Sequence, residues 1–514
     1  MGVGVAQVAN AAMQQAAWRW GSLKALKKAA SPMRRVGGAP ARCTTRPPCA
    51  RAPRFTMATR GAAVREHLER LLRVGTCLAQ CGYGAQVGQL AACARAFRGD
   101  AQLWTAHARY RGPGGCTALM HAAASGDMPR VQFLLDRGAD VEAVDAVFGD
   151  TALMLACGAG YTEAARLLIK RGGANSNAAR SADGMTALMW ASHNGHLETA
   201  RYLVERGDAN VGAATTTDGK TALMWASEKG HFEIVRYLVE RGGANVSAAR
   251  TTDGMTALMW ASQKGHVDIV CFLVESGGEN VNAARTTTGM TALMYASKYG
   301  HLEIVRFLVE CGGANANAVR TTDGCTALMF ASKKGHHEIV RCLVQRGCAN
   351  SNAVKTTDCC TALLFASQNG HLEAVRILVE LGGASVNAAK TTDGFTALMR
   401  ASQFGYLEIV RFLVERGGAS VNATMTNDGM TALMWACQGG HPEIARFLVE
   451  HGANVDAVRA LCGRTSLMIA SKKGHVAIVR LLLECGANKH LVSLAGRTAL
   501  GYAASHPLVL DALA

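Results

Sequence analysis

Hydrophobic and polar positions along this chain follow a unit of about 35 residues that recurs through most of its 514 residues. In one copy, Leu258 and Ala261 are spaced as on one face of a short helix. Further along, Ile269, Val270 and Leu273 follow the spacing of the apolar stripe of a second helix. The pattern therefore predicts two short helices in each unit.

Turn and capping residues mark the ends of these two predicted helices. Asp253 begins a turn signal with the glycine that follows it. Thr256 is suited to cap the first helix, because its hydroxyl can accept a hydrogen bond from a free backbone N–H. Gly265 ends the first helix, and Gly277 with its neighbouring glycine ends the second. The polar segment after these glycines predicts a loop to the next unit.

Twelve copies of the unit can be aligned on the threonine of the motif T-A-L, which reads T-S-L in one copy. The threonines are Thr117, Thr151, Thr186, Thr221, Thr256, Thr291, Thr326, Thr361, Thr396, Thr431, Thr465 and Thr498. A fixed spacing of 33 to 35 residues is typical of stacked-repeat architectures. One such unit cannot bury its apolar face alone, so neighbouring units should share a continuous core.

The repeated unit resembles the ankyrin repeat. The segment DGKTALMWASEKGHFEIVRYLVERGGANVSA, residues 218–248, carries the family's pattern, and the resemblance covers about residues 113–514. Two positions depart from the usual T-P-L-H motif, since Ala257 and Met259 stand where the family has Pro and His. The resemblance implies an all-α repeat solenoid, a curved array of helix-turn-helix units with β-hairpin or loop fingers.

The net charge of +16 is concentrated before the repeats. Residues 1–65 hold 12 Lys or Arg and no acid, whereas the remaining 449 residues hold 42 basic and 38 acidic groups. Residues 1–60 therefore predict either a basic disordered leader or an organelle transit peptide, which is rich in Arg and poor in acids. Met57 is an alternative start of translation.

The segment 61–112 predicts two or three helices that form either a degenerate first cap or another small module. Residues 87–109 loosely resemble the second half of an F-box, with Leu103 and Trp104 in its L-W step, although the Leu-Pro opening is missing. This resemblance implies, as the alternative function, a substrate-recruiting subunit of a ubiquitin ligase. At the other end, residues 496–514 predict a C-terminal cap, because the second helix is short and no loop follows it.

Cysteine and histidine positions do not suggest a metal site. The 17 cysteines are odd in number and occupy unrelated places in different units, which fits a reducing compartment better than a disulfide framework. Cys77 and Cys81 form a lone C-x3-C without a second pair. A histidine recurs after Gly in eight units, for example His231 and His266, but neighbouring copies should lie about 10 Å apart, too far to share one zinc ion.

No catalytic motif was found. The chain has no phosphate loop, no G-x-S-x-G and no H-E-x-x-H sequence. An acidic column that includes Glu198 and Glu233 is followed three residues later by arginines such as Arg201 and Arg236, which predicts surface ion pairs on the second helix. We therefore expect a protein that is not an enzyme, needs no cofactor and holds other proteins as a scaffold.

Candidate partner-binding residues lie on the first helix of each unit. An aromatic column follows the T-A-L-M motif and comprises Trp190, Trp225, Trp260, Tyr295 and Phe330. These rings can pack between units, or they can form a partly exposed strip of the kind that dominates binding energy. Positions three and four beyond the aromatic residue vary, and from 229 to 334 they supply Lys229, Lys264, Lys298, Lys333 and Lys334. We expect this concave face to favour an acidic or phosphorylated protein partner.

A second basic column lies at the loop tips and is expected to be solvated charge. Its members are Arg180, Arg250, Arg285, Arg320, Lys355 and Lys390. Nucleic acid is not the expected ligand, since loops of this family commonly carry such residues. No run of 18 apolar residues predicts a membrane span. The expected state is a monomer in the cytoplasm or nucleus, unless residues 1–60 direct the chain to an organelle.

Overall fold

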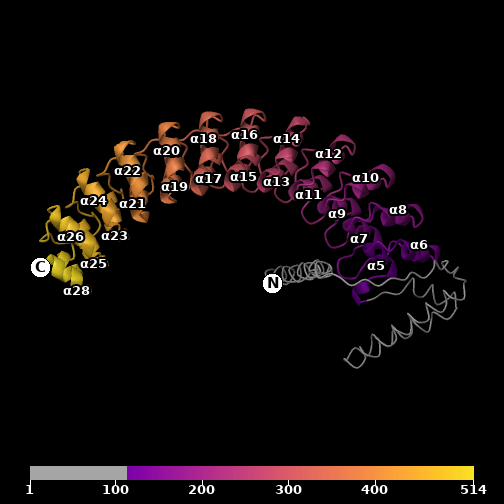
Figure 1. The fold of residues 1–514 in the computed structure, drawn as a ribbon, viewed down its shortest axis with the longest axis horizontal. Coiled ribbons are helices and arrows are strands. Elements are labelled where there is room, and N and C mark those ends of the chain that lie inside the picture. The colour runs from indigo at the N-terminus through magenta and orange to yellow at the C-terminus, as the bar shows by residue number, and fades with distance from the viewer. Residues whose placement is uncertain (1–112) are drawn as a thin grey trace, which may run out of the picture. The chain divides into compact units, whose positions relative to one another are not determined.

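The computed structural model describes residues 113–514, which form twelve successive helix pairs after a short 3-10 turn, η1, at Pro113–Gly115. The pairs stack side by side into an arch (Figure 1). The predictions for residues 1–60 and 61–112, including the leader, the cap and the F-box-like module, fall outside the described residues. The predicted all-α repeat solenoid is confirmed for the part of the chain that the structure describes.

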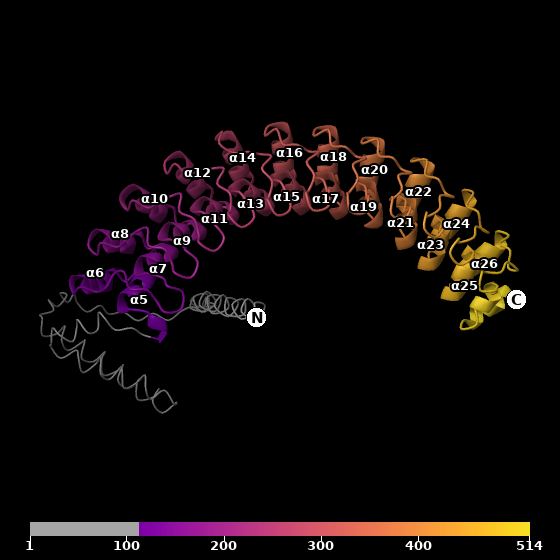
Figure 2. The same ribbon diagram turned by 180° about the vertical axis from the view of Figure 1, so that it is seen from behind.

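The first helix of each pair lies on the inner, concave side of the arch (Figures 1 and 2). These inner helices are α5 (Ala118–Ser125), α7 (Ala152–Ala159), α9 (Ala187–Asn194), α11 (Ala222–Lys229), α13 (Ala257–Lys264), α15 (Ala292–Tyr299), α17 (Ala327–Lys334), α19 (Ala362–Gln368), α21 (Ala397–Phe404), α23 (Ala432–Gly439), α25 (Ser466–Lys473) and α27 (Ala499–Tyr502).

The second helix of each pair lies on the outer, convex side (Figures 1 and 2). These outer helices are α6 (Met128–Asp136), α8 (Thr162–Lys170), α10 (Leu197–Arg206), α12 (Phe232–Glu240), α14 (Val267–Glu275), α16 (Leu302–Glu310), α18 (His337–Gln345), α20 (Leu372–Glu380), α22 (Leu407–Glu415), α24 (Pro442–Glu450), α26 (Val476–Glu484) and α28 (Pro507–Leu513). The last pair falls in residues 496–514, and the assignment of that segment as a cap stays a prediction.

Most inner helices begin at the predicted threonine and end at the predicted glycine, whereas α19 and α27 have Asn369 and Ala503 at the C-cap. The Thr256 hydroxyl accepts a hydrogen bond from the Met259 N–H at 3.4 Å, and Gly265 ends α13 in a left-handed conformation with φ of 87°. The Gly265 N–H then donates to the Ala261 carbonyl, which closes the last turn. An eight-residue helix is marginal alone, so these caps and the packing between units hold it.

The core runs without interruption through the stack. Leu258 and Ile269 are each 1% exposed, and Val270 and Leu273 are fully buried. Burial of one such side chain contributes on the order of 2 kcal/mol. Equivalent residues of the other units belong to the same hydrophobic cluster, from Ala118 to Leu513. The shared core that the repeat pattern predicts is therefore present.

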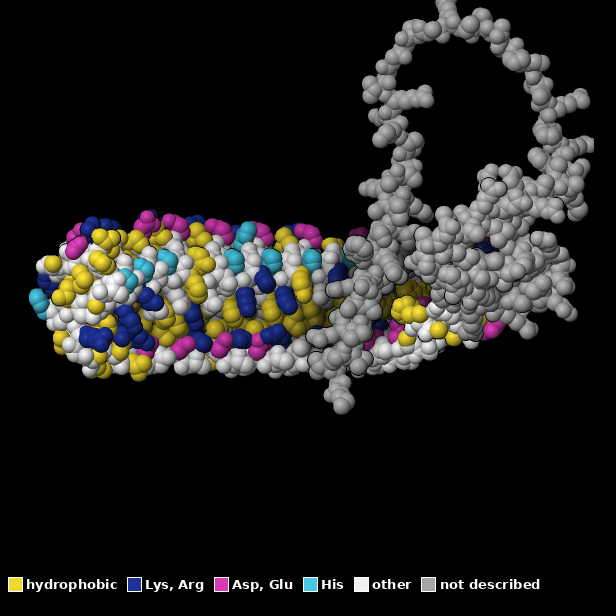
Figure 3. All heavy atoms as spheres, turned by 90° about the horizontal axis from the view of Figure 1, so that it is seen from below, with side chains coloured by type: hydrophobic (Ala, Val, Ile, Leu, Met, Phe, Trp, Pro, Cys, Tyr) yellow, Lys and Arg dark blue, Asp and Glu magenta, His cyan; other side chains and the backbone are white. Residues whose placement is uncertain are grey.

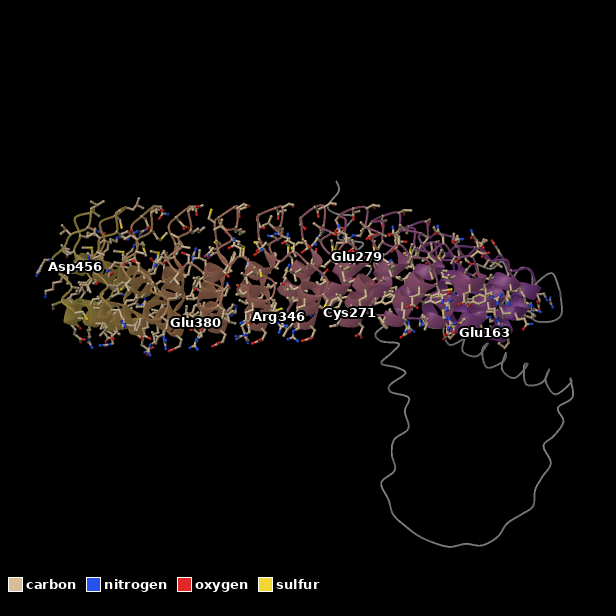
Figure 4. The ribbon with its side chains drawn as sticks, turned by 90° about the horizontal axis from the view of Figure 1, so that it is seen from above. Glu163, Cys271, Glu279, Arg346, Glu380 and Asp456 are labelled. Atoms are coloured by element: carbon tan, nitrogen blue, oxygen red, sulfur yellow. The ribbon has the colours of Figure 1, made fainter. Side chains whose placement is uncertain are left out.

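A finger loop connects each outer helix to the next inner helix, and the fingers project along one side of the helix layers (Figure 4). Six fingers close with a single antiparallel bridge, such as Ala249 to Thr256, rather than with longer strands. Gly254 has a φ of 74°, and a Cβ atom there would lie 2.8 Å from Thr286 of the next finger. Glycine is needed at this turn because the adjacent finger packs so closely. The Thr286 N–H donates to the Asp253 carbonyl at 2.8 Å, which joins the two fingers.

Candidate partner-binding face

The predicted aromatic residues lie in the middle of inner helices on the concave side of the arch, and the predicted lysines lie in the last turn. Figure 3 shows Lys and Arg side chains running along this face, with hydrophobic side chains between them. A helix of eight residues makes about two turns, so the aromatic residue and the lysine four positions later share one side. Trp225 and Lys229 on α11 are related in this way, as are Trp260 and Lys264 on α13.

The aromatic column is largely covered. Trp190, Trp225, Trp260 and Phe330 are half-buried, and Tyr295 is only 5% exposed. Both readings of the column apply in part, because four rings pack inside the array and still keep one edge at the surface. Tyr295 offers almost no surface to a partner.

Cations from the fingers lie over these rings. The Arg250 guanidinium carbon is 5.5 Å from the centre of the Trp260 ring, and the Arg180 carbon is 5.2 Å from that of Trp190. Lys220 sits between two indoles, with its Nζ 3.5 Å from the Trp225 ring and 4.3 Å from the Trp260 ring. Cation–π contacts of this length are attractive, and more so when the cation is desolvated. The aromatic column and the finger cations therefore form one packed layer.

The prediction that the finger cations are solvated charges is wrong. Their side chains are only 12–30% exposed, and each contacts an aspartate. Asp253 joins two fingers, since it pairs with Arg250 of its own turn and lies 2.7 Å from Arg285 of the next. Hydrogen bonds from Arg250 hold the pKa of Asp253 below its usual value. The physical reason for the error is the Arg-x-x-Asp spacing, which the tight turn converts into an ion pair.

The lysines of the concave face behave differently. Lys229, Lys264, Lys333 and Lys334 are exposed, and Lys298 is half-buried. Among the described residues, these five lysines lie in no ion pair with a carboxylate. The nearby acid Glu228 pairs with Lys220 instead. The structure thus brings the five predicted lysines to one face and leaves their charges available.

The recurring histidines join neighbouring units. His231 Nε2 lies 3.1 Å from the His193 carbonyl oxygen, and His266 Nε2 lies 3.2 Å from that of Glu228. His196, His301, His371 and His441 repeat this contact with the preceding unit. Burial lowers the pKa of His231, His336 and His475, which favours neutral rings. The predicted structural role of this row is in accord with these contacts.

The convex helices carry the predicted surface ion pairs. Arg201 lies 3.4 Å from Glu198, and Arg236 lies 2.6 Å from Glu233. Within residues 113–514, no cluster of three or more His, Cys, Asp or Glu side chains is placed to hold a metal ion. No helix in this range has the length and apolarity needed to cross a bilayer.

Comparison with known proteins agrees with the geometry. The family model for ankyrin repeats, described as three copies, matches this chain in seven overlapping segments between residues 119 and 514. The chain belongs to the ankyrin-repeat family. Ankyrin repeats are generally protein–protein interaction modules, and the family is typically non-catalytic.

Two proteins of Rickettsia felis also resemble the ankyrin array, and the names of both contain the words ankyrin repeat protein. Each is 56% identical to this chain over 45 residues, which is 9% of this chain and 70% of one relative or 67% of the other. The similarity spans little more than one repeat of the array.

Two features of the ankyrin array were missed from the sequence although a signal was present. Lys220 stands where neighbouring units have Met185 and Met255, and it is buried between indoles. Glu279 stands where neighbouring units have Ala244 and Ala314, and both of its carboxylate oxygens are buried. For Glu279 the available signal was a charge in a column that is alanine in the other repeats, from Ala139 to Ala487. For Lys220 the signal was weaker, because Asp150, Arg464 and Arg497 stand at the same position in other repeats.

Proposed function

We propose that this chain is a non-enzymatic scaffold that binds partner proteins on the concave face of its ankyrin array. The observation that supports this most directly is the contrast between two sets of cations. The finger cations are neutralised by aspartates, whereas Lys229, Lys264, Lys298, Lys333 and Lys334 have no carboxylate within ion-pair distance among the described residues.

The partner is proposed to be acidic or phosphorylated at the surface that docks here. Exposed cations without partners raise the association rate of an acidic protein and select against a basic one. The half-buried rings of Trp190, Trp225, Trp260 and Phe330 supply apolar edges beside these lysines. Tyr295 serves the packing of the array rather than the contact itself.

We do not propose a nucleic-acid ligand, because the second row of cations is already occupied by ion pairs within the fingers. The scaffold is proposed to act as a monomer without a cofactor, in the cytoplasm or nucleus. Targeting of the chain to an organelle by residues 1–60 is the alternative.

Affinity capture with the full chain tests the binding face. In one variant, all five concave lysines are changed to Gln. In the matched control, five convex arginines that make only surface pairs, Arg201, Arg236, Arg306, Arg341 and Arg376, are changed to Gln. We expect captured proteins to be lost from the first variant and retained by the second. Equal capture by both variants would contradict the concave assignment.

A further inference from the structure

A cavity of about 390 Å³ opens between the fingers and the inner helices α17, α19 and α21. Its apolar walls include Phe330 and Phe365, and its polar rim includes Arg400 and Lys333. This volume is within the range of sites that hold a small ligand or a large side chain. The concave face therefore has a recess at these three inner helices.

The cavity lies at repeats in which the position of the aromatic column is not occupied by tryptophan. Trp190, Trp225, Trp260 and Trp435 fill this position in other repeats. Phe330 and Phe365 are smaller, and Arg400 has no ring at all. The smaller or ringless side chains coincide with the space at these three repeats.

The lining is strongly basic. It contains five cations and two carboxylates, a formal charge of 5 − 2 = +3. Two of its members are thiols, and burial raises the pKa of Cys325 to about 12 and that of Cys360 to about 11. Both thiols are therefore protonated at neutral pH and add no negative charge to the cavity.

Three of the five cations are engaged by the fingers. Arg320 pairs with Asp323, and Lys355 lies 3.1 Å from Asp358. Lys390 lies 3.1 Å from Asp393, which is outside the lining. These pairs belong to the finger network and hold its geometry.

Arg400 and Lys333 are the two cations of the lining without a carboxylate partner among the described residues. Arg400 donates a hydrogen bond to the Gln403 side chain at 3.0 Å and lies 3.6 Å above the Phe395 ring. Burial of its guanidinium lowers the pKa of Arg400, although the group stays charged at neutral pH. A half-buried cation that lacks an anion is poorly solvated, so an incoming anion would gain a charge-assisted hydrogen bond there.

We propose that this cavity binds a phosphotyrosine side chain of a partner polypeptide, with the ring against Phe330 and Phe365 and the phosphate beside Arg400. This inference rests on the proposed scaffold function and assigns the side-chain chemistry of one contact. Guanidinium groups match phosphate oxygens in a fork geometry, and Lys333 adds a second positive charge at the rim.

A phosphorylated ring suits the cavity better than the other acidic side chains. A phosphate carries close to two negative charges near pH 7, whereas Asp and Glu carry one. Phosphoserine and phosphothreonine supply the charge but have no ring to pack beside Phe330 and Phe365. Only the aromatic phosphate uses both the walls and the rim.

Binding to peptide libraries tests the proposal with the full chain. Three immobilised degenerate libraries carry a fixed central phosphotyrosine, tyrosine or glutamate. The cavity variants are Arg400→Gln, which removes charge, and Phe365→Trp, which fills the space with the residue of four other repeats. The matched control is Arg306→Gln, which removes an exposed arginine from the convex helix α16, outside the cavity lining.

We expect at least tenfold more wild-type protein on phosphotyrosine beads than on tyrosine or glutamate beads. Arg400→Gln and Phe365→Trp should lose this preference, and Arg306→Gln should keep it, with wild-type circular dichroism in every variant. Equal retention on phosphotyrosine and either other library overturns the proposal, as does an unchanged preference in both cavity variants. If either of these results is obtained and the five-lysine variant still loses its captured proteins, the cavity assignment fails and the proposed scaffold function stands.

Discussion

His266 Nε2 lies 3.2 Å from the carbonyl oxygen of Glu228, a residue 38 positions earlier on the preceding inner helix. The ring closes the junction between two repeats at the point where α11 ends and its last carbonyl groups lack helical partners. The same contact recurs at other junctions, so a single residue type supplies a polar link at each of them, whereas at another junction Tyr406 takes the place of the histidine.

Replacement His266→Ala should weaken the junction between α11 and α13 by about 1–2 kcal/mol, because the Glu228 carbonyl loses its partner. Amide hydrogen exchange of the two helices measures this local change. His337→Ala, which removes an exposed histidine from an outer helix, is the control and should leave exchange almost unchanged. Equal protection of α11 and α13 from amide exchange in both variants would show that the His266 contact does not stabilise the junction.

The replacement Asp253→Asn should loosen two fingers, because it removes the carboxylate that pairs with both Arg250 and Arg285. Asp253 is 3% exposed, and we expect a local loss of about 2–4 kcal/mol. Exchange of the Thr286 amide, which donates to the Asp253 carbonyl, reports the effect. Asp268→Asn on the exposed side of α14 is the matched control.

The pH dependence of this pair has a defined sign. The folded-state pKa of Asp253 is lowered from its ordinary value of 3.8 by the hydrogen bond from Arg250. Its contribution to stability is therefore fully present above that ordinary value and is lost as the pH falls through the folded pKa. Acid should thus reproduce the exchange pattern of Asp253→Asn.

Glu279→Ala should stabilise the array at pH 8 by about 2 kcal/mol and should have little effect at pH 4. Burial raises the pKa of Glu279 from 4.5 to about 7, and the Thr256 side chain offsets only part of the rise. The unfolded chain ionises first as the pH increases, so wild-type stability falls between about 4.5 and 7 and is level above that range.

Urea unfolding of the wild-type and Glu279→Ala chains at the two pH values measures this difference. Glu279 lies between the helices and the finger loops, whereas Arg346 lies at the opposite edge of the array (Figure 4). Glu275→Ala, an exposed change at the end of α14, is the control and should show no such pH dependence. A gain of equal size at pH 4 and pH 8 would contradict the burial argument.

Cys359→Gly should raise stability by about 1 kcal/mol, because Cys359 adopts a left-handed backbone with φ of 52°. Gly324 and Gly394 hold the equivalent turn position in the adjacent fingers at φ of 74° and 80°. Thermal unfolding of the wild-type and variant chains measures the change in stability. Cys311→Gly makes the same chemical change at φ of −113° and should lower stability instead, since glycine there only adds freedom to the unfolded chain.

The elements of the fold could be predicted from local signals. Thr256, Gly265 and the stripe containing Leu258 define a helix without reference to distant residues, and the structure places its ends at the expected positions. Repetition strengthened the prediction, because twelve copies with the same signals cannot each arise by chance.

The candidate site could be predicted only in part. Sequence spacing places Trp260 and Lys264 on one side of a helix, but Arg250 reaches the Trp260 ring only because the finger folds back across it. The cavity depends on three repeats at once, since Phe330, Phe365 and Arg400 are 35 residues apart in succession. Such relations between repeats arise from stacking, which the pattern of a single repeat does not contain.

The links described above, from His266 to Glu228 and from Asp253 to Arg285, join each repeat to its immediate neighbour. Because each repeat contacts only its neighbours, the array should be elastic along its length rather than rigid. Under tension applied at its two ends, it would lengthen first by small tilts at every junction and then release its repeats one by one, starting at the weakest junction.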